Sequence, residues 1–320
     1  MTLEISNLTR KYGERVAVDN VSFEVQDGKL TGFVGANGAG KTTVMRMILG
    51  VLTPDAGAVT RDGTALTEAM RRSFGYMPEE RGLYPKMKVR EQLIYFARLH
   101  GLSKDQALGN ADRLLDVLGL TERANDPVEN LSLGNQQRAQ IAVSLVHDPS
   151  ALVLDEPFSG LDPMAVDVIL SVLETNAARG IPILLSSHQL DVVERLCDDI
   201  VIIAEGKIAA KGSIAELQKR YSDGLRRLSI RGGVDWLREE SGVEVIEASS
   251  DEVPGVSATL LRLDEVSYPG LDQHLLRKAL GQGEVLAFGP ETVRLSAIFK
   301  EAVGDDKGGA SDASDEGSAR

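Results

Sequence analysis

The chain has 320 residues, with 35 Lys and Arg against 48 Asp and Glu, so its formal net charge is −13. This acidic balance argues against non-specific nucleic-acid binding as the main activity, and no nucleic-acid partner is expected. Hydrophobic residues make up 42% of the sequence, enough for two domain cores, but no apolar run approaches the roughly 18–20 residues that a membrane-spanning helix needs.

The N-terminal segment and the cysteine content both favour a reducing cytoplasm. Residues 1–7 have neither the basic lead nor the apolar run of a secretory signal. Cys197 is the single cysteine, which excludes an internal disulfide framework. The four histidines lie too far apart in sequence to give a recognisable zinc pattern.

Short apolar runs alternate with helix-length amphipathic segments over roughly the first 220 residues, which predicts an α/β fold with a largely buried sheet. The predicted strands include 30–34, 151–154, 183–185 and 200–203. Apolar residues at three- and four-residue intervals predict helices over about 89–100 and 107–118, so the middle, about 80–150, is expected to be helical.

The pattern changes after residue 221. Strands are predicted over 226–231, 243–249, 256–263 and 284–288, and helices over 234–241, 271–280 and about 293–303. The order β-α-β-β-α-β with a closing helix predicts a small α+β domain of the ferredoxin-like kind over 222–303. The final stretch, 304–320, is acidic and rich in Gly, Ala and Ser, which predicts a disordered tail.

A phosphate-binding loop is predicted directly after the strand 30–34. Residues 35–42 read GANGAGKT, fit G-x-x-x-x-G-K-[ST], and precede a helix-forming run that begins at Thr43. Glycines let the backbone aim N–H groups at phosphate oxygens, and the helix N-terminus adds its positive dipole end. Lys41 would reach the β- and γ-phosphates, and Thr42 would place its hydroxyl on Mg²⁺. The expected loop residues are Gly35, Asn37, Gly38, Ala39, Gly40, Lys41, Thr42 and Thr43.

Two acids directly follow the apolar strand 151–154, and carboxylate oxygens can bind the metal ion. We expect Asp155 to bind Mg²⁺, directly or through water, and Glu156 to act as the general base that polarises the attacking water. Paired acids at a strand end are often mere solubilising residues, so the phosphate loop upstream is what favours the catalytic interpretation.

Between these two motifs, residues 131–138 read LSLGNQQR, and here the sequence resembles an ABC-transporter ATP-binding subunit. The family signature is LSGGQ, from which this copy departs at Leu133 and Asn135, while Ser132 and Gly134 keep a hydroxyl and a helix N-terminus that can face a γ-phosphate. The resemblance covers about residues 1–221 and implies a P-loop NTPase cassette with a helical subdomain that binds and hydrolyses ATP.

The resemblance assigns further residues. Tyr12 lies where the family places an aromatic ring that stacks on adenine, Asp162 belongs to a D-loop, and His188 corresponds to the switch histidine. In the family, two cassettes pair head to tail, so that ATP held by Lys41 of one meets Ser132 of the other. One phosphate loop and one signature therefore imply a homodimer or a sister subunit.

The Q-loop position departs from the family. After Tyr76-Met77-Pro78 the family has glutamine, whereas this sequence has Glu79. A carboxylate can still coordinate Mg²⁺ or a water but adds negative charge beside a polyphosphate, so Glu79 is expected to keep the metal-sensing role with altered pH or metal dependence. The run 78–85, the LGNQQ signature and the C-terminal domain resemble the export branch, which includes sodium-efflux and antibiotic-resistance ATPases.

The resemblance implies membrane permease subunits as partners and a location on the inner face of the cell membrane. Residues 81–105 carry a local charge balance of +4 where the permease would dock, although a solvated helix face is the better explanation for most of these charges. A soluble ATPase acting on ribosomes is the alternative, but such proteins usually have two cassettes. A chromosome-type protein is disfavoured because only 89 residues, without sustained heptads, separate Lys41 from Leu131. Residues 222–303 are left open as a sensor or a dimerisation module.

Overall fold

The computed structural model describes residues 2–80, 82–250 and 255–304. These divide into two compact units, one comprising residues up to Ile214 together with those from Phe299, and the other Ala215–Ile298. The predicted disordered tail, 304–320, lies outside the described residues except for Gly304. In the described part of the chain, no helix has the length and apolar character needed to cross a bilayer.

The first unit contains a six-stranded sheet with the order β10-β9-β3-β8-β7-β6. Its strands are β3 (Leu30–Val34), β6 (Phe74–Met77), β7 (Ala151–Leu154), β8 (Ile183–Ser187), β9 (Asp199–Ala204) and β10 (Lys207–Ser213). All neighbouring pairs are parallel except β9 with β10. Every residue of β3, β7 and β8 is buried, which is why these strands are continuous apolar runs without alternation. The predicted buried sheet is therefore confirmed.

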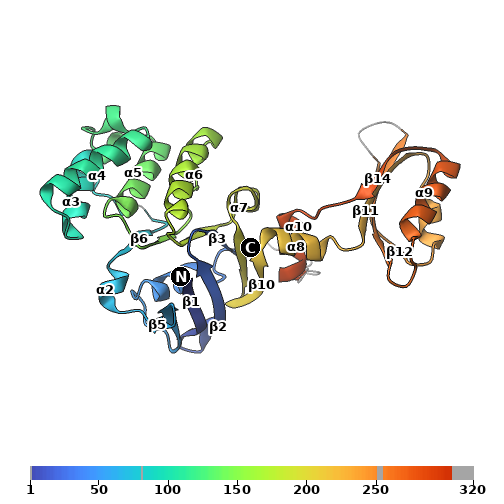
Figure 1. Cartoon of the computed structure of the whole chain (residues 1–320), viewed down its shortest axis with the longest axis horizontal. Helices are drawn as coiled ribbons and strands as arrows, with labels where there is room; N and C mark the ends of the chain where they lie inside the picture. The colour runs from blue at the N-terminus through green and yellow to red at the C-terminus, as the bar shows by residue number, and fades with distance from the viewer. Residues whose placement is uncertain (1, 81, 251–254, 305–320) are drawn as a thin grey trace, which may run out of the picture. The chain divides into compact units, whose positions relative to one another are not determined.

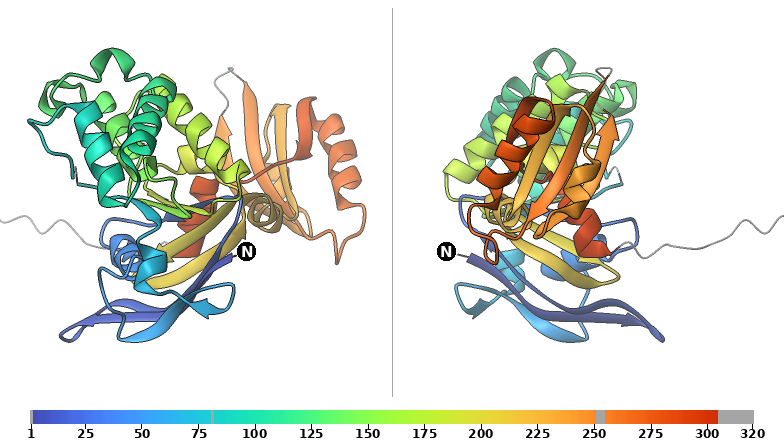
Figure 2. Two further views of the ribbon diagram at one scale, coloured as in Figure 1. Left: turned by 60° about the vertical axis from the view of Figure 1, so that its left-hand side comes forward. Right: turned by 90° about the vertical axis from the view of Figure 1, so that its right-hand side faces the viewer.

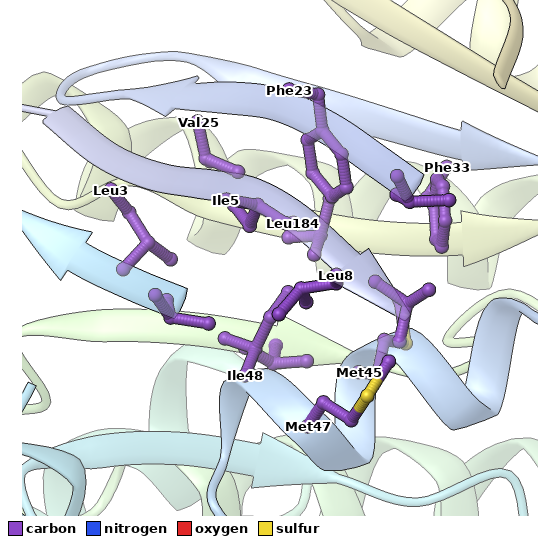
Figure 3. Packing of buried hydrophobic residues seen from close by; sticks show 14 of the residues in the cluster. Leu3, Ile5, Leu8, Phe23, Val25, Phe33, Met45, Met47, Ile48 and Leu184 are labelled. Carbon is purple, nitrogen blue, oxygen red and sulfur yellow. The ribbon is translucent and has the colours of Figure 1, made fainter. Parts of the chain in front are cut away.

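An antiparallel sheet with the order β2-β1-β4-β5 packs against the six-stranded one (Figure 3). It is formed by β1 (Thr2–Tyr12), β2 (Arg15–Gln26), β4 (Ala56–Arg61) and β5 (Thr64–Ala65). Phe23 of β2 stacks on Phe33 of β3 with ring centroids 5.2 Å apart, and α1 (Lys41–Ile48) inserts Met45, Met47 and Ile48 into the same core. This core fixes the end of β3 from which the phosphate loop departs.

The helical part of the first unit is built around α3 (Val89–Leu99), α4 (Lys104–Val117) and α5 (Leu133–Leu145), which pack against one another (Figure 1). α4 begins three residues before the predicted 107 because Ser103 and Gln106 form a capping box that satisfies the first backbone N–H groups. The remaining helical elements are α2 (Glu68–Arg71), η1 (Thr121–Arg123), η2 (Val128–Asn130), α6 (Pro163–Ala178) and α7 (Leu190–Leu196). The helical middle of the cassette is as predicted.

The second unit is a four-stranded antiparallel sheet with the order β12-β13-β11-β14 (Figure 2). Its elements are β11 (Leu225–Arg231), η3 (Asp235–Glu239), β12 (Val243–Ser250), β13 (Val256–Leu263), α9 (Leu271–Gln282) and β14 (Glu284–Pro290). α9 buries Leu271, Leu275 and Ala279 against Leu228 and Leu261 of the sheet.

The strand order of this unit is the one that β-α-β-β-α-β connectivity produces. The predicted helix 234–241 is wrong in type, because the segment between Gly233 and Gly242 forms only the 3₁₀ helix η3. The ferredoxin-like classification and the domain limits at 221 and 303 stay predictions. α8 (Ile214–Tyr221) and α10 (Leu295–Val303) lie where the chain passes between the two units.

Candidate nucleotide site

The phosphate loop connects β3 to α1, and close packing requires glycine at two of its positions, Gly35 and Gly40. Gly40 caps α1 with φ 108°, and a Cβ added there would lie 2.9 Å from the oxygen of Ala17. At Gly35, a Cβ would lie 2.4 Å from the oxygen of Ile203. Residues with side chains would push the loop away from both neighbours, so the tight turn that presents the N-terminus of α1 depends on these positions.

Lys41 is buried, and its ammonium group is held by the loop itself. Nζ donates hydrogen bonds to the backbone oxygens of Gly35, at 2.7 Å, and Ala36, at 3.3 Å. These bonds keep the side chain folded back over the loop. Phosphate oxygens are charged acceptors and bind an ammonium group more strongly than neutral carbonyls do, so Nζ can exchange these contacts for a triphosphate.

The two acids after β7 are both buried beside the loop. Thr42 Oγ1 donates a hydrogen bond to Asp155 Oδ2 at 2.9 Å, and Glu79 lines the same pocket. A hydroxyl and carboxylates form the oxygen donor set that Mg²⁺ prefers, and it usually completes its shell with substrate phosphates. The residues at this position therefore fit Mg²⁺. Among the described residues, no group of three or more His, Cys, Asp and Glu forms a cation cage of its own.

Glu156 sits in a left-handed turn with φ 53°, an unusual conformation for a residue with a long side chain. Its carboxylate meets the imidazole of His188, with 2.9 Å between Oε2 and Nδ1. An ionised carboxylate only accepts hydrogen bonds, so the imidazole donates from Nδ1. The turn thus places Glu156 next to a group that holds its carboxylate in position.

Tyr76 on β6 lies close enough to Asp155 to feel its charge. Burial, and next the negative charge of Asp155, raises the pKa of Tyr76, while Arg46 opposes this shift by charge and by a side-chain hydrogen bond. The phenol therefore stays protonated and adds no charge beside the metal-binding position.

The pocket formed by these groups has a volume of about 530 Å³. Its lining is Tyr12, Arg15, Ala17, Asn37, Gly38, Gly40, Lys41, Thr42, Thr43, Glu79, Asp155 and Glu156. Tyr12 has 50% of its surface exposed, and the Arg10 guanidinium lies 5.1 Å from its ring centroid. A flat, accessible ring at the pocket edge suits stacking of a base.

Ser132 and Asp162 cap helices outside this pocket. The Ser132 side chain accepts from the Asn135 N–H at the start of α5, and Asp162 accepts from Ala165 N–H, at 2.8 Å, at the start of α6. Leu133 packs over Gly160, where an added Cβ would lie 3.0 Å from Leu133 Cδ2. The described lining of the pocket includes neither Ser132 nor Gly134, so the signature of this chain does not contribute to the pocket around its own phosphate loop.

Four residues near the site escaped the sequence analysis. Arg15 and Ala17 line the pocket from β2, Gln137 of α5 donates to the backbone oxygens of Glu156 and Pro157, and Ser186 contacts both acids. Gln137 lies within the signature and Ser186 precedes Ser187 and His188, so both stood beside recognised motifs. Their contacts with the acids arise only in the folded structure, and no sequence pattern marks them.

The comparisons with known proteins agree with this geometry. Residues 18–159 match the family model described as "ABC transporter". The ABC transporter ATP-binding protein YhaQ of Bacillus subtilis, which has no characterised function, is 36% identical over 304 residues, covering 94% of this chain and 98% of that protein. The chain belongs to the ABC transporter ATP-binding proteins. It is an ATPase subunit, and the predicted resemblance, cassette fold and ATP hydrolysis are confirmed.

Two further relatives of this ABC subunit carry functional names. The linearmycin resistance ATP-binding protein LnrL of B. subtilis is 34% identical, covering 72% of this chain and 75% of its own length. Nod factor export ATP-binding protein I of Ralstonia nicotianae is 35% identical, covering 82% of this chain and 77% of its own length. A solved ATP-binding subunit of an ABC transporter superposes with a TM-score of 0.64 at 32% identity, covering 69% of this chain and 93% of that one.

Proposed function

We propose that the pocket binds Mg-ATP through the residues that the sequence analysis singled out. Backbone N–H groups of residues 35–43 and Lys41 hold the phosphates, Tyr12 stacks on adenine, and Thr42, Asp155 and Glu79 face Mg²⁺. Mg²⁺ would neutralise the charge that develops between the β- and γ-phosphates. The hydrogen bond from Thr42 to Asp155 supports this assignment because it holds the two expected ligands side by side.

Hydrolysis then depends on Glu156. Its carboxylate takes the proton of the attacking water as oxygen bonds to the γ-phosphorus, and the bond to the bridging oxygen breaks with its electron pair leaving on ADP. His188 orients the carboxylate through the 2.9 Å contact. Lys41 stabilises the negative charge on the γ-phosphate as the bond breaks.

A second cassette completes the site in this proposal. Helix α5 begins at the Ser132 cap and contains Gly134, and α6 begins at the Asp162 cap. None of these three residues belongs to the pocket lining that the structure describes. A γ-phosphate in the partner's pocket would supply the anion that the N-terminus of α5 favours. A homodimer, or a pair with a sister subunit, therefore closes around ATP and opens after hydrolysis.

We further propose that this subunit energises export through separate membrane permease subunits and so lies at the inner face of the cell membrane. One observation carries the proposal: a groove of about 800 Å³ lined by Tyr84, Pro85, Lys86, Met87, Tyr95 and Glu129, directly after the Glu79 segment. Tyr84 and Tyr95 remain 51% and 39% exposed although their rings contact each other and Phe96. Exposed clustered aromatics of this kind mark protein-binding surfaces.

The names of two relatives support export as the direction of transport. LnrL is named for linearmycin resistance and the Ralstonia protein for Nod factor export. Both names fit removal of a substrate from the cell interior. In this proposal, residues 1–221 form the cassette, residues 222–303 form an accessory domain, and nucleic acid is not a partner.

The test is capture of Glu156→Gln protein with its partners from detergent-solubilised native membranes in Mg-ATP. This variant should bind ATP and hydrolyse it slowly, so the closed complex persists. Recovery of a multi-span membrane protein is expected. A second variant, Tyr84→Ala with Tyr95→Ala, should lose that protein, whereas Val51→Ser, which alters an exposed apolar residue elsewhere, should keep it.

Recovery of ribosomes without a membrane protein would favour the alternative, a soluble ABC-type ATPase. If the tyrosine double variant and the Val51→Ser control capture the membrane protein equally well, the groove is not the permease-binding surface.

A further inference from the structure

Ser186 occupies a central position beside the acids. It is the penultimate residue of β8, and the parallel register pairs Leu185 with Leu154, so Ser186 lies level with Asp155. It has 0% of its surface exposed. A hydroxyl in such a place requires partners, because a buried polar group without a hydrogen bond is destabilising.

The partners of Ser186 are the two acids themselves. Oγ donates to Asp155 Oδ1 at 2.5 Å and accepts from the Glu156 N–H at 2.9 Å. Asp155 Oδ2 is held in turn by Thr42 Oγ1 at 2.9 Å. Both oxygens of the Asp155 carboxylate are therefore fixed, and Ser186 directs Oδ2 toward Thr42 and the position where the donor set fits Mg²⁺.

The second bond concerns the backbone turn of Glu156. The left-handed conformation, φ 53°, is unfavourable for glutamate and persists only where surrounding contacts hold it. The Ser186 hydroxyl is the acceptor of the Glu156 N–H, and without it this buried donor would lack its partner. Loss of the hydroxyl would therefore loosen the turn that aims the Glu156 side chain.

His188, which directly follows β8, also contacts Glu156, but that contact differs in character. The His188 side chain is 54% exposed, whereas Ser186 is enclosed. An exposed side chain can change rotamer when nucleotide or a partner arrives, while a buried hydroxyl held by two bonds stays in place. Ser186 is therefore suited to be the fixed contact.

We propose that Ser186 is a positioning residue for ATP hydrolysis, whose hydroxyl orients the Asp155 carboxylate toward the divalent cation and holds the backbone of Glu156. The inference rests on ATP hydrolysis by the cassette and on the site roles proposed above, and it does not depend on export. Basal hydrolysis by the purified protein tests it without any permease, so its failure and the failure of the export proposal are distinguishable.

The experiment compares Ser186→Ala with Ser186→Thr, which keeps a hydroxyl, and with the control Ser144→Ala. Ser144 is also buried, and its hydroxyl donates to the oxygen of Ile141 within α5, away from the acids. Three quantities are measured: deuterium exchange of the Glu156 amide in protein free of metal and nucleotide, ATP binding in EDTA, and the Mg²⁺ dependence of hydrolysis.

For Ser186→Ala we expect faster exchange at the Glu156 amide, and a half-saturating Mg²⁺ concentration raised about 10–100-fold, the usual effect of removing a group that orients a metal ligand. The kcat should fall while ATP binding in EDTA stays the same. Ser186→Thr should restore slow exchange and Mg²⁺ dependence, and Ser144→Ala should match the wild type.

Two results overturn the proposal. In the first, Ser186→Ala and Ser144→Ala show the same Glu156 exchange rate and the same Mg²⁺ dependence. In the second, Ser186→Ala lowers kcat without changing either quantity, which would indicate a general packing defect. If the threonine variant fails to fold, the alanine variant and its control still decide between these outcomes.

Discussion

The side-chain amide of Gln137 donates a hydrogen bond, 3.2 Å long, to the backbone oxygen of Glu156. The same Nε2 donates to the oxygen of Pro157 at 3.0 Å, and one turn further along α5 the amide of Gln140 donates to the oxygen of Pro78 at 2.7 Å. The helix that begins at the signature thus holds both the acid turn and the segment that leads to the Q-loop position. A displacement of this helix would be transmitted to Glu156 through a short, buried connection.

Replacing Gln137 by leucine should therefore impair hydrolysis more than binding. The variant leaves the buried oxygen of Pro157 without its donor and removes one of two donors from the oxygen of Glu156, which keeps the Ser159 N–H. An unsatisfied buried acceptor costs about 1–3 kcal/mol of stability. The acid turn loses its support while the phosphate loop is untouched, so kcat should fall and the affinity for ATP should stay within about twofold. Steady-state kinetics and a thermal melt measure the two effects. Gln273→Leu, at an exposed position of α9, is the control, and equal kcat in both variants would contradict the prediction.

Glu79 and Glu80 offer a matched pair for the Q-loop position, because both are exposed and only Glu79 lines the nucleotide pocket. Glu79→Gln removes a negative charge near the polyphosphate but keeps an oxygen ligand. We expect ATP to bind more tightly in EDTA, because the repulsion is gone, and the half-saturating Mg²⁺ concentration to rise, because a neutral oxygen attracts the cation less. Titrations of ATP and Mg²⁺ measure both shifts. Glu80→Gln should behave as the wild type, and the same behaviour in Glu79→Gln would exclude the metal-sensing role.

Tyr12 should contribute to ATP affinity through its ring alone. Stacking between a base and an aromatic side chain is worth about 1–3 kcal/mol per base by alanine substitution. Tyr12→Ala should therefore weaken ATP binding about 5–150-fold, and Tyr12→Phe should bind as the wild type does. Binding of ATP compared with tripolyphosphate provides the check, because the loss should vanish for the ligand without a base. An equal loss for both ligands would show that Tyr12 acts on the loop instead.

Much of this protein was predictable from sequence because its chemistry lies in contiguous segments. The phosphate loop, the acid pair and the signature each follow a strand or begin a helix, and the positions of Lys41, Thr42 and Asp155 in one pocket follow from parallel strands ending at one edge. The sheet itself was readable as uncharged apolar runs.

The contacts that support the acids were not predictable in this way. Gln137 reaches Glu156 from helix α5, and Ser186 reaches it from the neighbouring strand β8, so neither contact has a local sequence pattern. The second unit shows a further limit of prediction from sequence, which concerns the type of helix. Residues 234–241 have helix-like periodicity, but flanking glycines and short length leave only a 3₁₀ turn. Periodicity reports which side chains share a face and says little about how many turns a segment completes.

His147 and His100 form a stacked pair, with ring centroids 3.7 Å apart and planes 10° from parallel. His147 Nε2 lies 3.2 Å from the oxygen of Phe74, and His100 Nδ1 lies 3.1 Å from the oxygen of Arg72. Carbonyl oxygens only accept, so Nε2 of His147 donates, and its Nδ1 is buried with no hydrogen-bond partner in the described structure. Burial, and next the charge of His100, lowers the pKa of His147 to about 4, against smaller opposing effects of the Phe74 hydrogen bond and Asp148.

This geometry predicts acid sensitivity of the cassette. The unfolded chain binds a proton at His147 below its ordinary pKa of 6.5, whereas the folded chain does not until pH falls to about 4, so the free energy of unfolding decreases as pH falls between these values. The total loss is at most about 3 kcal/mol, at about 1.4 kcal/mol per pH unit. His147→Gln, which retains a donor for Phe74 but does not titrate, should have a flatter dependence on pH. Urea unfolding followed by circular dichroism from pH 4.5 to 7.5 measures it, with His274→Gln, at an exposed position, as the control. Parallel curves for the wild type and His147→Gln would show that protonation of His147 is not what destabilises the fold.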